Sequence, residues 1–425
     1  MRNLMMEGKN KQDMNSDDRA QLQLERLQST LNRAYRNVPF HQSRQNKIAR
    51  ETGRDPSVLE NQAMISDFPF MQRKHLGEHY PYGLFAVPLR DIVRIHTAPG
   101  TGSNPTVTGY TRQDLTIWKE MVAQAFKAAG VTSHDILQIS LDPGLANWGR
   151  DYKDGAESLG LGVIPNTPIS SEKQLMILRD YKTSVLVTTP SEASQLAAQM
   201  FKFKLNPSAF NLKHLILVGE PVSKEFREQV EKQLHVETWL HYGLSEVPGP
   251  AIAYECEHHK GLHINEDHFL PEIIDPESGN VLPKGEKGEL VLTSLTIRAF
   301  PLIRFRTGEG ASFITEPCLC GRSLIRMEWL DFRADDILNI NGVKVHQNQI
   351  LHCLKSQLGF TPSYCISIKK ELGKKNYLEI YLSMEGKLFS DEIKILENQI
   401  KSLKDNLHEN LGVPVQIKLK ESFSK

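Results

Sequence analysis

Apolar residues recur at helical spacing near the start of the chain and again after residue 110. The first stripe predicts a helix over residues 17–38, which Pro39 ends, and the second predicts a helix over residues 111–129 with Thr111 as its cap. Short apolar runs then alternate with helical patterns. Strands are expected at residues 136–141, 162–164, 184–187, 214–218 and 236–241, and helices at 151–159, 171–180, 191–203 and 224–234. This alternation is typical of a largely parallel sheet covered by helices.

The pattern changes after Gly261, where short strands are separated by glycine and proline turns. Strands are expected at residues 262–264, 269–274, 288–294 and 302–305. Asn341-Gly342 predicts a tight turn. Beyond the turn we expect a helix at 347–358, strands at 364–368 and 377–382, a helix at 390–411 and a strand at 413–419. This last part, of roughly 90 residues, has the size of a separate α+β domain.

The overall composition excludes several classes of protein. Lys plus Arg and Asp plus Glu both number 51, so no net charge attracts the chain to nucleic acid. No apolar run approaches the roughly 20 residues that cross a bilayer, and the polar first 19 residues lack the apolar core of a signal peptide. Five cysteines fit a reducing compartment better than a disulfide framework. We therefore expect a soluble, cytoplasmic protein with neither a nucleic-acid nor a membrane partner.

One polar loop, residues 94–110, offers candidate chemistry. It reads Arg-Ile-His-Thr-Ala-Pro-Gly-Thr-Gly-Ser-Asn-Pro-Thr-Val-Thr-Gly-Tyr, between an apolar lead-in and a returning strand. Its glycines let the backbone approach a ligand closely, and its hydroxyls can donate to a polyphosphate without adding charge. The hydroxyl donors are Thr97, Thr101, Ser103 and Thr106. The Gly-Lys-Ser/Thr ending of a Walker loop is absent, and an ordinary hairpin loop is the alternative.

Further motifs follow the loop in a fixed order. They are Gly219-Glu220-Pro221, Tyr242-Gly243-Leu244-Ser245-Glu246, Glu255-Cys256 with Gly261-Leu262-His263, Arg304-Phe305-Arg306-Thr307-Gly308, Cys318-Leu319-Cys320-Gly321-Arg322 and Asp335-Asp336. With the loop, which is similar to a His-x-Ser-Ser-Gly-Thr-Thr-Gly-Lys-Pro-Thr motif, they resemble the phenylacetate–CoA ligase family of adenylate-forming enzymes, over about residues 37–419. The resemblance implies an α/β fold with two domains. A large layered N-terminal AMP-binding domain would span residues 1–334, and a small α+β C-terminal lid domain residues 335–425, with Asp335 at the hinge.

The resemblance also implies an ATP-dependent acid–CoA ligase that works in two steps. A carboxylate attacks the α-phosphate of ATP to give an acyl-adenylate and pyrophosphate, and the thiol of CoA then displaces AMP. The implied catalytic residues are Glu246, which would hold Mg²⁺ with the hard oxygen ligand this ion prefers, Ser245 beside it, and Arg306, which with Arg304 would supply positive charge. Tyr242 would offer a flat face to adenine. The other implied nucleotide-binding residues are Thr97, Gly100, Thr101, Gly102, Ser103, Gly219, Glu220, Pro221, Gly243, Glu309 and Arg333.

The sequence departs from the family pattern at three places. The polar loop lacks two hydroxyls and the lysine, and Pro99 removes a backbone donor. Glu309 stands where the family has an aspartate that holds the ribose hydroxyls. The family's C-terminal lysine, which approaches the α-phosphate, would lie in a loop that begins roughly where the sequence ends, so we assign this role to no lysine. A catalytically impaired nucleotide-binding homologue that acts as a regulator or partner-binding protein is therefore the rival hypothesis, and a scaffold without nucleotide affinity is the third.

Three cysteines and a histidine predict a structural zinc site. Six residues separate Cys256 from His263, and Cys318-Leu319-Cys320 follows about 55 residues later. Three thiolates and an imidazole would close the coordination sphere, with free thiols in loops as the alternative. His258 and His259 are alternative ligands or solvated loop residues. The remaining cysteines are expected to be buried packing residues: Cys353 in a helix and Cys365 in a strand.

The sequence leaves the substrate open. Asn147, Trp148 and Tyr152 stand where the family has a glycine-rich, aromatic segment that lines its aryl pocket. Because this segment is altered, the carboxylic acid need not be phenylacetate. The acceptor would be CoA or a carrier-protein thiol, and the sequence is compatible with a homodimer.

Overall fold

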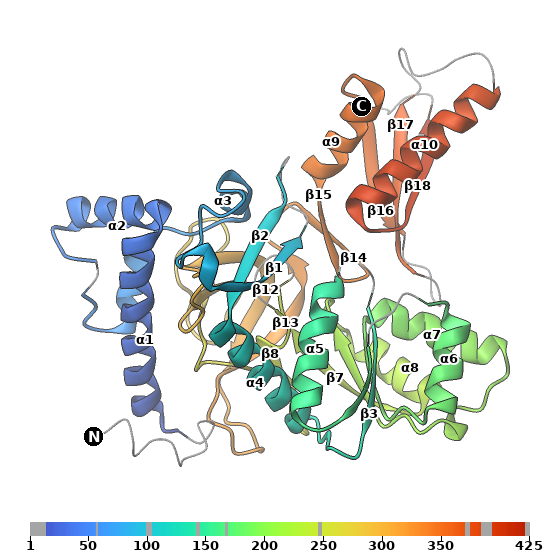
Figure 1. Ribbon diagram of the computed structural model, residues 1–425, viewed down its shortest axis with the longest axis horizontal. Coiled ribbons are helices and arrows are strands. Elements are labelled where there is room, and N and C mark those ends of the chain that lie inside the picture. The colour runs from blue at the N-terminus through green and yellow to red at the C-terminus, as the bar shows by residue number, and fades with distance from the viewer. Residues whose placement is uncertain are drawn as a thin grey trace.

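A mixed sheet organises the larger part of the protein, which we call the body (Figure 1). The structure, a computed structural model, describes residues 14–56, 58–98, 104–141, 145–165, 169–244, 249–369, 375–383 and 393–420. The strands of the sheet are β3 (Ile136–Ser140), β4 (Gly162–Ile164), β5 (Val185–Thr188), β6 (His214–Val218), β7 (Glu237–Tyr242), β8 (Ala253–Tyr254), β9 (Leu262–Ile264), β10 (Phe269–Ile274), β11 (Lys287–Ser294), β12 (Phe305–Ile314) and β13 (Arg326–Arg333). Their order is β10-β11-β12-β13-β9-β8-β7-β6-β5-β3-β4.

Strands β4, β3, β5, β6 and β7 form the parallel half of the sheet. Helical connections link them, as parallel pairing requires. These helices are α5 (Ala146–Ser158), α6 (Ser171–Asp180), α7 (Pro190–Lys202) and α8 (Lys224–Leu234), and α4 (Arg112–Ala128) precedes β3. The predicted alternation is confirmed, although α5 begins five residues before the predicted start at residue 151. The Thr111 side chain caps α4 by accepting from Asp114 N, as predicted.

The other half of the sheet is antiparallel, and one prediction there is wrong. The strand expected at residues 302–305 is instead β12, which runs from Phe305 to Ile314. After Phe305 it reads Arg-Thr-Gly-Glu, a polar run that suggests a turn. These polar groups nevertheless find partners inside the sheet: Arg306 pairs with Glu289, and Thr307 Oγ1 donates to Leu290 O at 2.7 Å. A strand can therefore be buried without an apolar sequence.

Two helices at the N-terminus pack beside the body (Figure 1). Helix α1 (Ser16–Asn37) agrees with the prediction, and α2 (Pro39–Thr52) starts directly at the proline that was expected only to end α1. Proline suits a first helical position, because the amide it lacks would have no helical partner. The other elements of the body that the structure describes are the hairpin β1 (Ile92–Ala98) and β2 (Thr106–Thr111), α3 (Arg73–Glu78), and the 3₁₀ turns Gln62–Asp67, Leu89–Asp91 and Pro207–Ala209.

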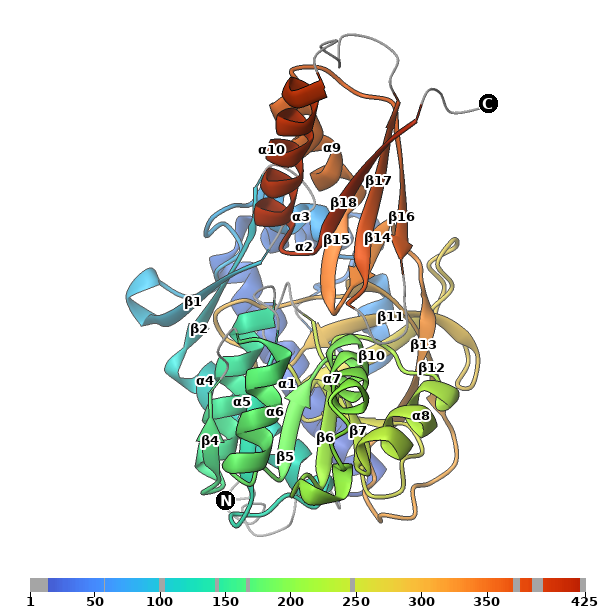
Figure 2. The same cartoon turned by 90° about the vertical axis from the view of Figure 1, so that its right-hand side faces the viewer.

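A smaller C-terminal unit stands on one end of the body (Figure 2). It consists of β14 (Ile337–Ile340), β15 (Val343–His346), α9 (Gln347–Leu358), β16 (Tyr364–Lys369), β17 (Tyr377–Ser383), α10 (Ile393–Leu411) and β18 (Val415–Lys420), around an apolar core of its own. The tight turn is confirmed: Ile340 pairs with Val343, and Asn341 and Gly342 have φ of 54° and 80°. The predicted domain boundary at residues 334/335 falls between β13 and β14, and it stays a prediction.

The two cysteines of the C-terminal unit differ in burial. Cys353 is buried in the core of the unit, as predicted. Cys365 is exposed, so the prediction of a packing role is wrong. Its neighbours Tyr364 and Ile366 pack on the core, and alternation along β16 turns Cys365 to the opposite face. No helix among the described residues is both long and apolar enough to cross a membrane.

Candidate nucleotide site and metal site

Two predicted nucleotide-binding segments lie at the same edge of the sheet. Gly219 directly follows β6, and Tyr242 is the last residue of β7, the next parallel strand. Ligands of open α/β sheets bind at the carboxyl ends of such strands. Tyr242 is fully buried, with its ring edge-on to Trp329 at a centroid distance of 4.9 Å. Ser245 and Glu246, which continue the second segment, lie outside the described residues.

The polar loop is described only at its two ends. Thr97 pairs with Val107 across the β1–β2 hairpin, and Thr97 is exposed. Gly100, Thr101, Gly102 and Ser103 lie outside the described residues, as does Pro99. Asn104, which stands at the position of the family's lysine, donates from Nδ2 to Gly77 O of α3 at 3.2 Å. The loop is thereby tied to α3 at its second end.

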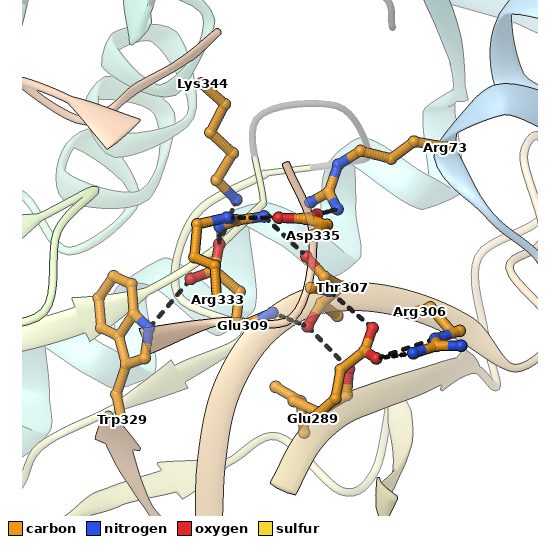
Figure 3. Close-up of polar contacts among 11 residues, drawn as sticks. Arg73, Glu289, Arg306, Thr307, Glu309, Trp329, Arg333, Asp335 and Lys344 are labelled. Atoms are coloured by element: carbon orange, nitrogen blue, oxygen red, sulfur yellow. Dashed lines mark hydrogen bonds and ion pairs between the residues drawn. The ribbon is translucent and has the colours of Figure 1, made fainter. Parts of the chain in front are cut away.

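Among the described residues, the carboxylate of Glu309, the predicted ribose-binding residue, accepts hydrogen bonds from Arg333 and Trp329 and forms an ion pair with Lys344 (Figure 3). Its Oε1 lies 2.5 Å from Arg333 Nη1 and 2.6 Å from Lys344 Nζ, and its Oε2 lies 3.2 Å from Trp329 Nε1. Burial by itself would raise the pKa of Glu309, but the charges of Lys344 and Arg333 outweigh it and lower this pKa to about 2. The carboxylate is therefore ionised at neutral pH. Arg333, a predicted nucleotide contact, is brought to the same site.

Asp335, the predicted hinge residue, is held between two arginines (Figure 3). Its carboxylate accepts from Arg73 Nη1 at 2.8 Å and from Arg333 Nε at 2.7 Å. Gly308 makes room for it: φ is +69°, and an added Cβ would lie 2.0 Å from Asp335 Oδ2. Only glycine therefore fits at this position, and Asp335 is not an isolated surface turn residue.

The two arginines predicted to supply charge both form ion pairs with glutamates. Arg304 is buried and pairs with Glu272 through two hydrogen bonds, so the structure places it in the core and corrects that expectation. Arg306 Nε donates to Glu289 Oε2 at 2.8 Å. Its side chain lines a cavity of about 280 Å³ that also touches Asp335. The catalytic role of Arg306 stays a prediction, since its charge faces Glu289 and the hinge.

The altered acid-pocket segment forms the first turns of α5. Trp148 is buried, and its Cη2 lies 3.3 Å from where a Cβ on Gly243 would stand, so the indole abuts the motif after β7. Asn147 Nδ2 lies 3.5 Å from Thr97 O. The Tyr152 hydroxyl lies 3.1 Å from Nδ1 of the buried His241. Large side chains thus fill the space beside the nucleotide motifs.

The C-terminal unit contacts the same edge of the body. Asn339 Nδ2 donates to Gly219 O at 2.8 Å. Ser191 Oγ donates to Glu220 and accepts from Asn376 Nδ2, both at 2.9 Å. The predicted residues Gly219 and Glu220 are therefore covered by this unit. Pro221 follows them, half-buried, in the loop before α8.

Sequence reasoning did not find Lys344, Trp329 or the other residues that join the two units. A lysine between two valines in a hairpin usually points to solvent, so the local pattern carried no signal for Lys344. Trp329 and Arg333 could have been connected to Glu309 only by the pairing of β12 with β13. The ion pair of Lys375 with Glu192, at 2.9 Å, likewise links distant segments.

The predicted metal ligands are brought together. One ligand atom from each of Cys256, His263, Cys318 and Cys320 lies within 4.8 Å of the other three. Sγ of Cys256 is 3.7 Å from Sγ of Cys318, and Sγ of Cys320 is 3.4 Å from Nε2 of His263. Zinc–sulfur bonds of about 2.3 Å at tetrahedral angles place two sulfurs about 3.8 Å apart, so the spacing fits a Cys₃His zinc site. The distance between the sulfurs of Cys256 and Cys318 is too long for a disulfide bond.

The alternative ligand His259 has other partners. Its Nε2 lies 3.0 Å from Glu237 Oε1 and its Nδ1 3.5 Å from Glu255 Oε2. These carboxylates, Glu255 foremost, raise the pKa of His259. In contrast, burial lowers the pKa of His263 to about 4, which keeps it in the neutral form that binds metals.

Comparisons with known proteins agree with these features. The family profile "AMP-binding enzyme" matches residues 159–297, and "AMP-binding enzyme C-terminal domain" matches residues 342–424. The chain is 36% identical to phenylacetate-coenzyme A ligase of Thermus thermophilus over 94% of its own length and 91% of the relative's, and 40% identical to that of Pseudomonas putida over 78% and 74%.

Solved structures show the same fold. A structure of 2-hydroxyisobutyryl-CoA ligase with 2-HIB-AMP and CoA in the thioesterification state superposes with a TM-score of 0.88 at 23% identity, covering 97% of this chain and 89% of that one. The same ligase in the postadenylation state with 2-HIB-AMP gives 0.69, covering 96% and 87%. From the identities and their coverage, the chain belongs to the phenylacetate–CoA ligase family of AMP-binding, adenylate-forming enzymes.

Proposed function

We propose that the protein is an ATP-dependent acid–CoA ligase that acts through an acyl-adenylate. The observation that carries this proposal is the 36% identity to a phenylacetate–CoA ligase over 94% of the chain. The geometry supports it, because Gly219, Tyr242 and the ionised Glu309 lie where the C-terminal unit meets the carboxyl ends of β6 and β7. A scaffold without nucleotide affinity would not need this arrangement.

The reaction would proceed in two displacements. A carboxylate oxygen of the acid attacks the α-phosphorus of ATP, and the bond to pyrophosphate breaks. The sulfur of the thiol then attacks the acyl carbon, forming the thioester, releasing AMP and passing its proton to solvent. Glu309 would accept from the ribose hydroxyls. Tyr242 would pack against adenine once its ring, fully buried in this structure, is uncovered. Glu246 would hold Mg²⁺, which neutralises phosphate charge, with Ser245 beside it.

The acceptor in this proposal is CoA, as in the names of the relatives. The acid is a small-molecule carboxylate whose size is set in part by Trp148, because the indole lies against Gly243. We further propose that Cys256, His263, Cys318 and Cys320 hold a structural zinc ion. Such a closed site would fasten the segment after β8 to the turn between β12 and β13, with no position open for catalysis.

The direct test is a panel of carboxylic acids with ATP, Mg²⁺ and CoA, followed by AMP and pyrophosphate release. At least one acid should support stoichiometric release of both products and formation of a thioester. Nucleotide binding without release for any acid would instead favour the impaired homologue. Absence of ATP and AMP binding by calorimetry would favour the scaffold.

A further inference from the structure

A buried ion pair between Lys344 and Glu309 joins the C-terminal unit to the body (Figure 3). Lys344 lies on β15 of the C-terminal unit, and Glu309 lies on β12 of the body. The side chains are 6% and 3% exposed, and Nζ is 2.6 Å from Oε1. A buried ammonium is costly unless it is paired, so this contact defines where Lys344 sits when the unit is docked.

The carboxylate of Glu309 has little room for further hydrogen bonds. An ionised carboxylate offers about four acceptor sites, of which the described residues Arg333 and Trp329 take two by hydrogen bonds, while the ammonium of Lys344 lies 2.6 Å from Oε1 as an ion pair. A ribose diol bound by both hydroxyls would need two more. Two donors and two hydroxyls would fill the four sites, so the third group against the carboxylate has to leave.

The sheet decides which donor can leave. Trp329 and Arg333 lie on β13, the strand paired with β12, and Glu309 is directly opposite Arg333 in the register. The sheet keeps the backbones of both residues beside Glu309, whatever the C-terminal unit does. Lys344 belongs to the C-terminal unit and joins the body through side-chain contacts. When it leaves, Arg333 still balances the charge of Glu309.

We propose that Lys344 and the ribose of the nucleotide compete for Glu309, so that nucleotide binding releases this contact of the C-terminal unit. The inference rests on the proposed function, which assigns the ribose to Glu309. Lys344 is then a positioning residue. Without nucleotide, its ion pair with Glu309 holds the C-terminal unit over Gly219. With nucleotide bound, the ion pair is broken and the C-terminal unit is free to move.

The test is AMP binding by calorimetry to the wild-type protein and to Lys344→Met, which keeps the aliphatic stem and removes the competing donor. The variant should bind AMP about 5-fold more tightly or better, the lower end of typical coupling between two binding events. The gain should vanish with 2′,3′-dideoxy-AMP, which lacks the ribose diol. Lys344→Arg should bind AMP like the wild type, because it restores a donor.

Lys375→Met is the matched control. It removes another ion pair between the two units, with Glu192, but leaves Glu309 untouched. It should leave AMP affinity nearly unchanged. An equal gain in this control, an unchanged or weaker affinity in Lys344→Met, or a gain that persists with the dideoxy nucleotide would overturn the inference.

Two further results separate this inference from the proposed function. AMP binding without the expected gain would overturn the competition alone. No AMP binding in any variant would overturn the proposed function and the competition with it. If Lys344→Met does not fold, Lys344→Gln gives a second neutral side chain for the same comparison.

Discussion

The contributions of Glu309 and Glu272 to the free energy of unfolding should change with pH in opposite directions. Both carboxylates are buried and paired with arginine, but Glu309 also has Lys344. Burial raises the pKa of Glu272 despite Arg304, whereas the two cations lower the pKa of Glu309 from 4.5 to about 2. A second cation therefore reverses the direction of the shift.

The magnitude follows from the pKa of Glu309. A folded-state pKa below the unfolded value stabilises the protein above the unfolded pKa, and this stabilisation is lost as pH falls through the folded pKa. A change from 4.5 to about 2 corresponds to about 3 kcal/mol at neutral pH. Glu309→Gln should thus lower the free energy of unfolding by about 3 kcal/mol at pH 7, and this deficit should shrink by about 1 kcal/mol between pH 4.5 and pH 3.5.

Urea denaturation followed by tryptophan fluorescence measures both quantities. Glu272→Gln is the matched control, since its folded pKa is raised: relative to this variant, the wild type should lose stability as pH rises through that pKa. The reasoning fails if the deficit of Glu309→Gln is the same at every pH from 7 to 3.5. It also fails if the two variants change with pH in the same direction.

Three further predictions concern the metal site, the hinge and the acid. Cys318→Ser should lower both the zinc content, from about one ion per chain by elemental analysis, and the unfolding temperature in a thermal scan. Cys365→Ser should alter neither quantity. A metal-free protein of unchanged stability would refute the site. Asp335→Pro should slow one half-reaction more than the other because it fixes φ, with Asp335→Ala as the control for the lost ion pairs; equal slowing of both would indicate a structural role. Trp148→Ala should raise kcat/KM for aryl acids over small acids about tenfold or more by pyrophosphate release, and an unchanged ratio would exclude Trp148 from the acid pocket.

Much of the α/β half could be predicted, because its signals are local. The helix Ser171–Asp180 and the strand His214–Val218 have the predicted bounds, since period and burial agree there. The errors have physical causes. Pro39 both ends one helix and starts the next, and the polar start of β12 is buried because its side chains find partners across the sheet.

The two candidate sites differ in how far sequence could reach. The zinc ligands could be predicted because three thiolates and an imidazole are a ligand set typical of zinc. That the four side chains lie within bonding distance of one ion is known only from the structure. The surroundings of Glu309 could not be predicted. They depend on strand register for Trp329 and Arg333, and on the docking of a second unit for Lys344.

The replacement of aspartate by Glu309 and the presence of Lys344 are best understood together. Glutamate carries its carboxylate one methylene further from β12, and in this structure one of its oxygens meets both Arg333 Nη1 and Lys344 Nζ. A shorter side chain on the same strand would reach less far toward β15. If Glu309 binds the ribose as proposed, what looks like a weakened ribose site in the sequence is a carboxylate that serves two partners. The departure from the family pattern at this residue therefore argues for a coupling between nucleotide and C-terminal unit, and it does not by itself argue for a lost activity.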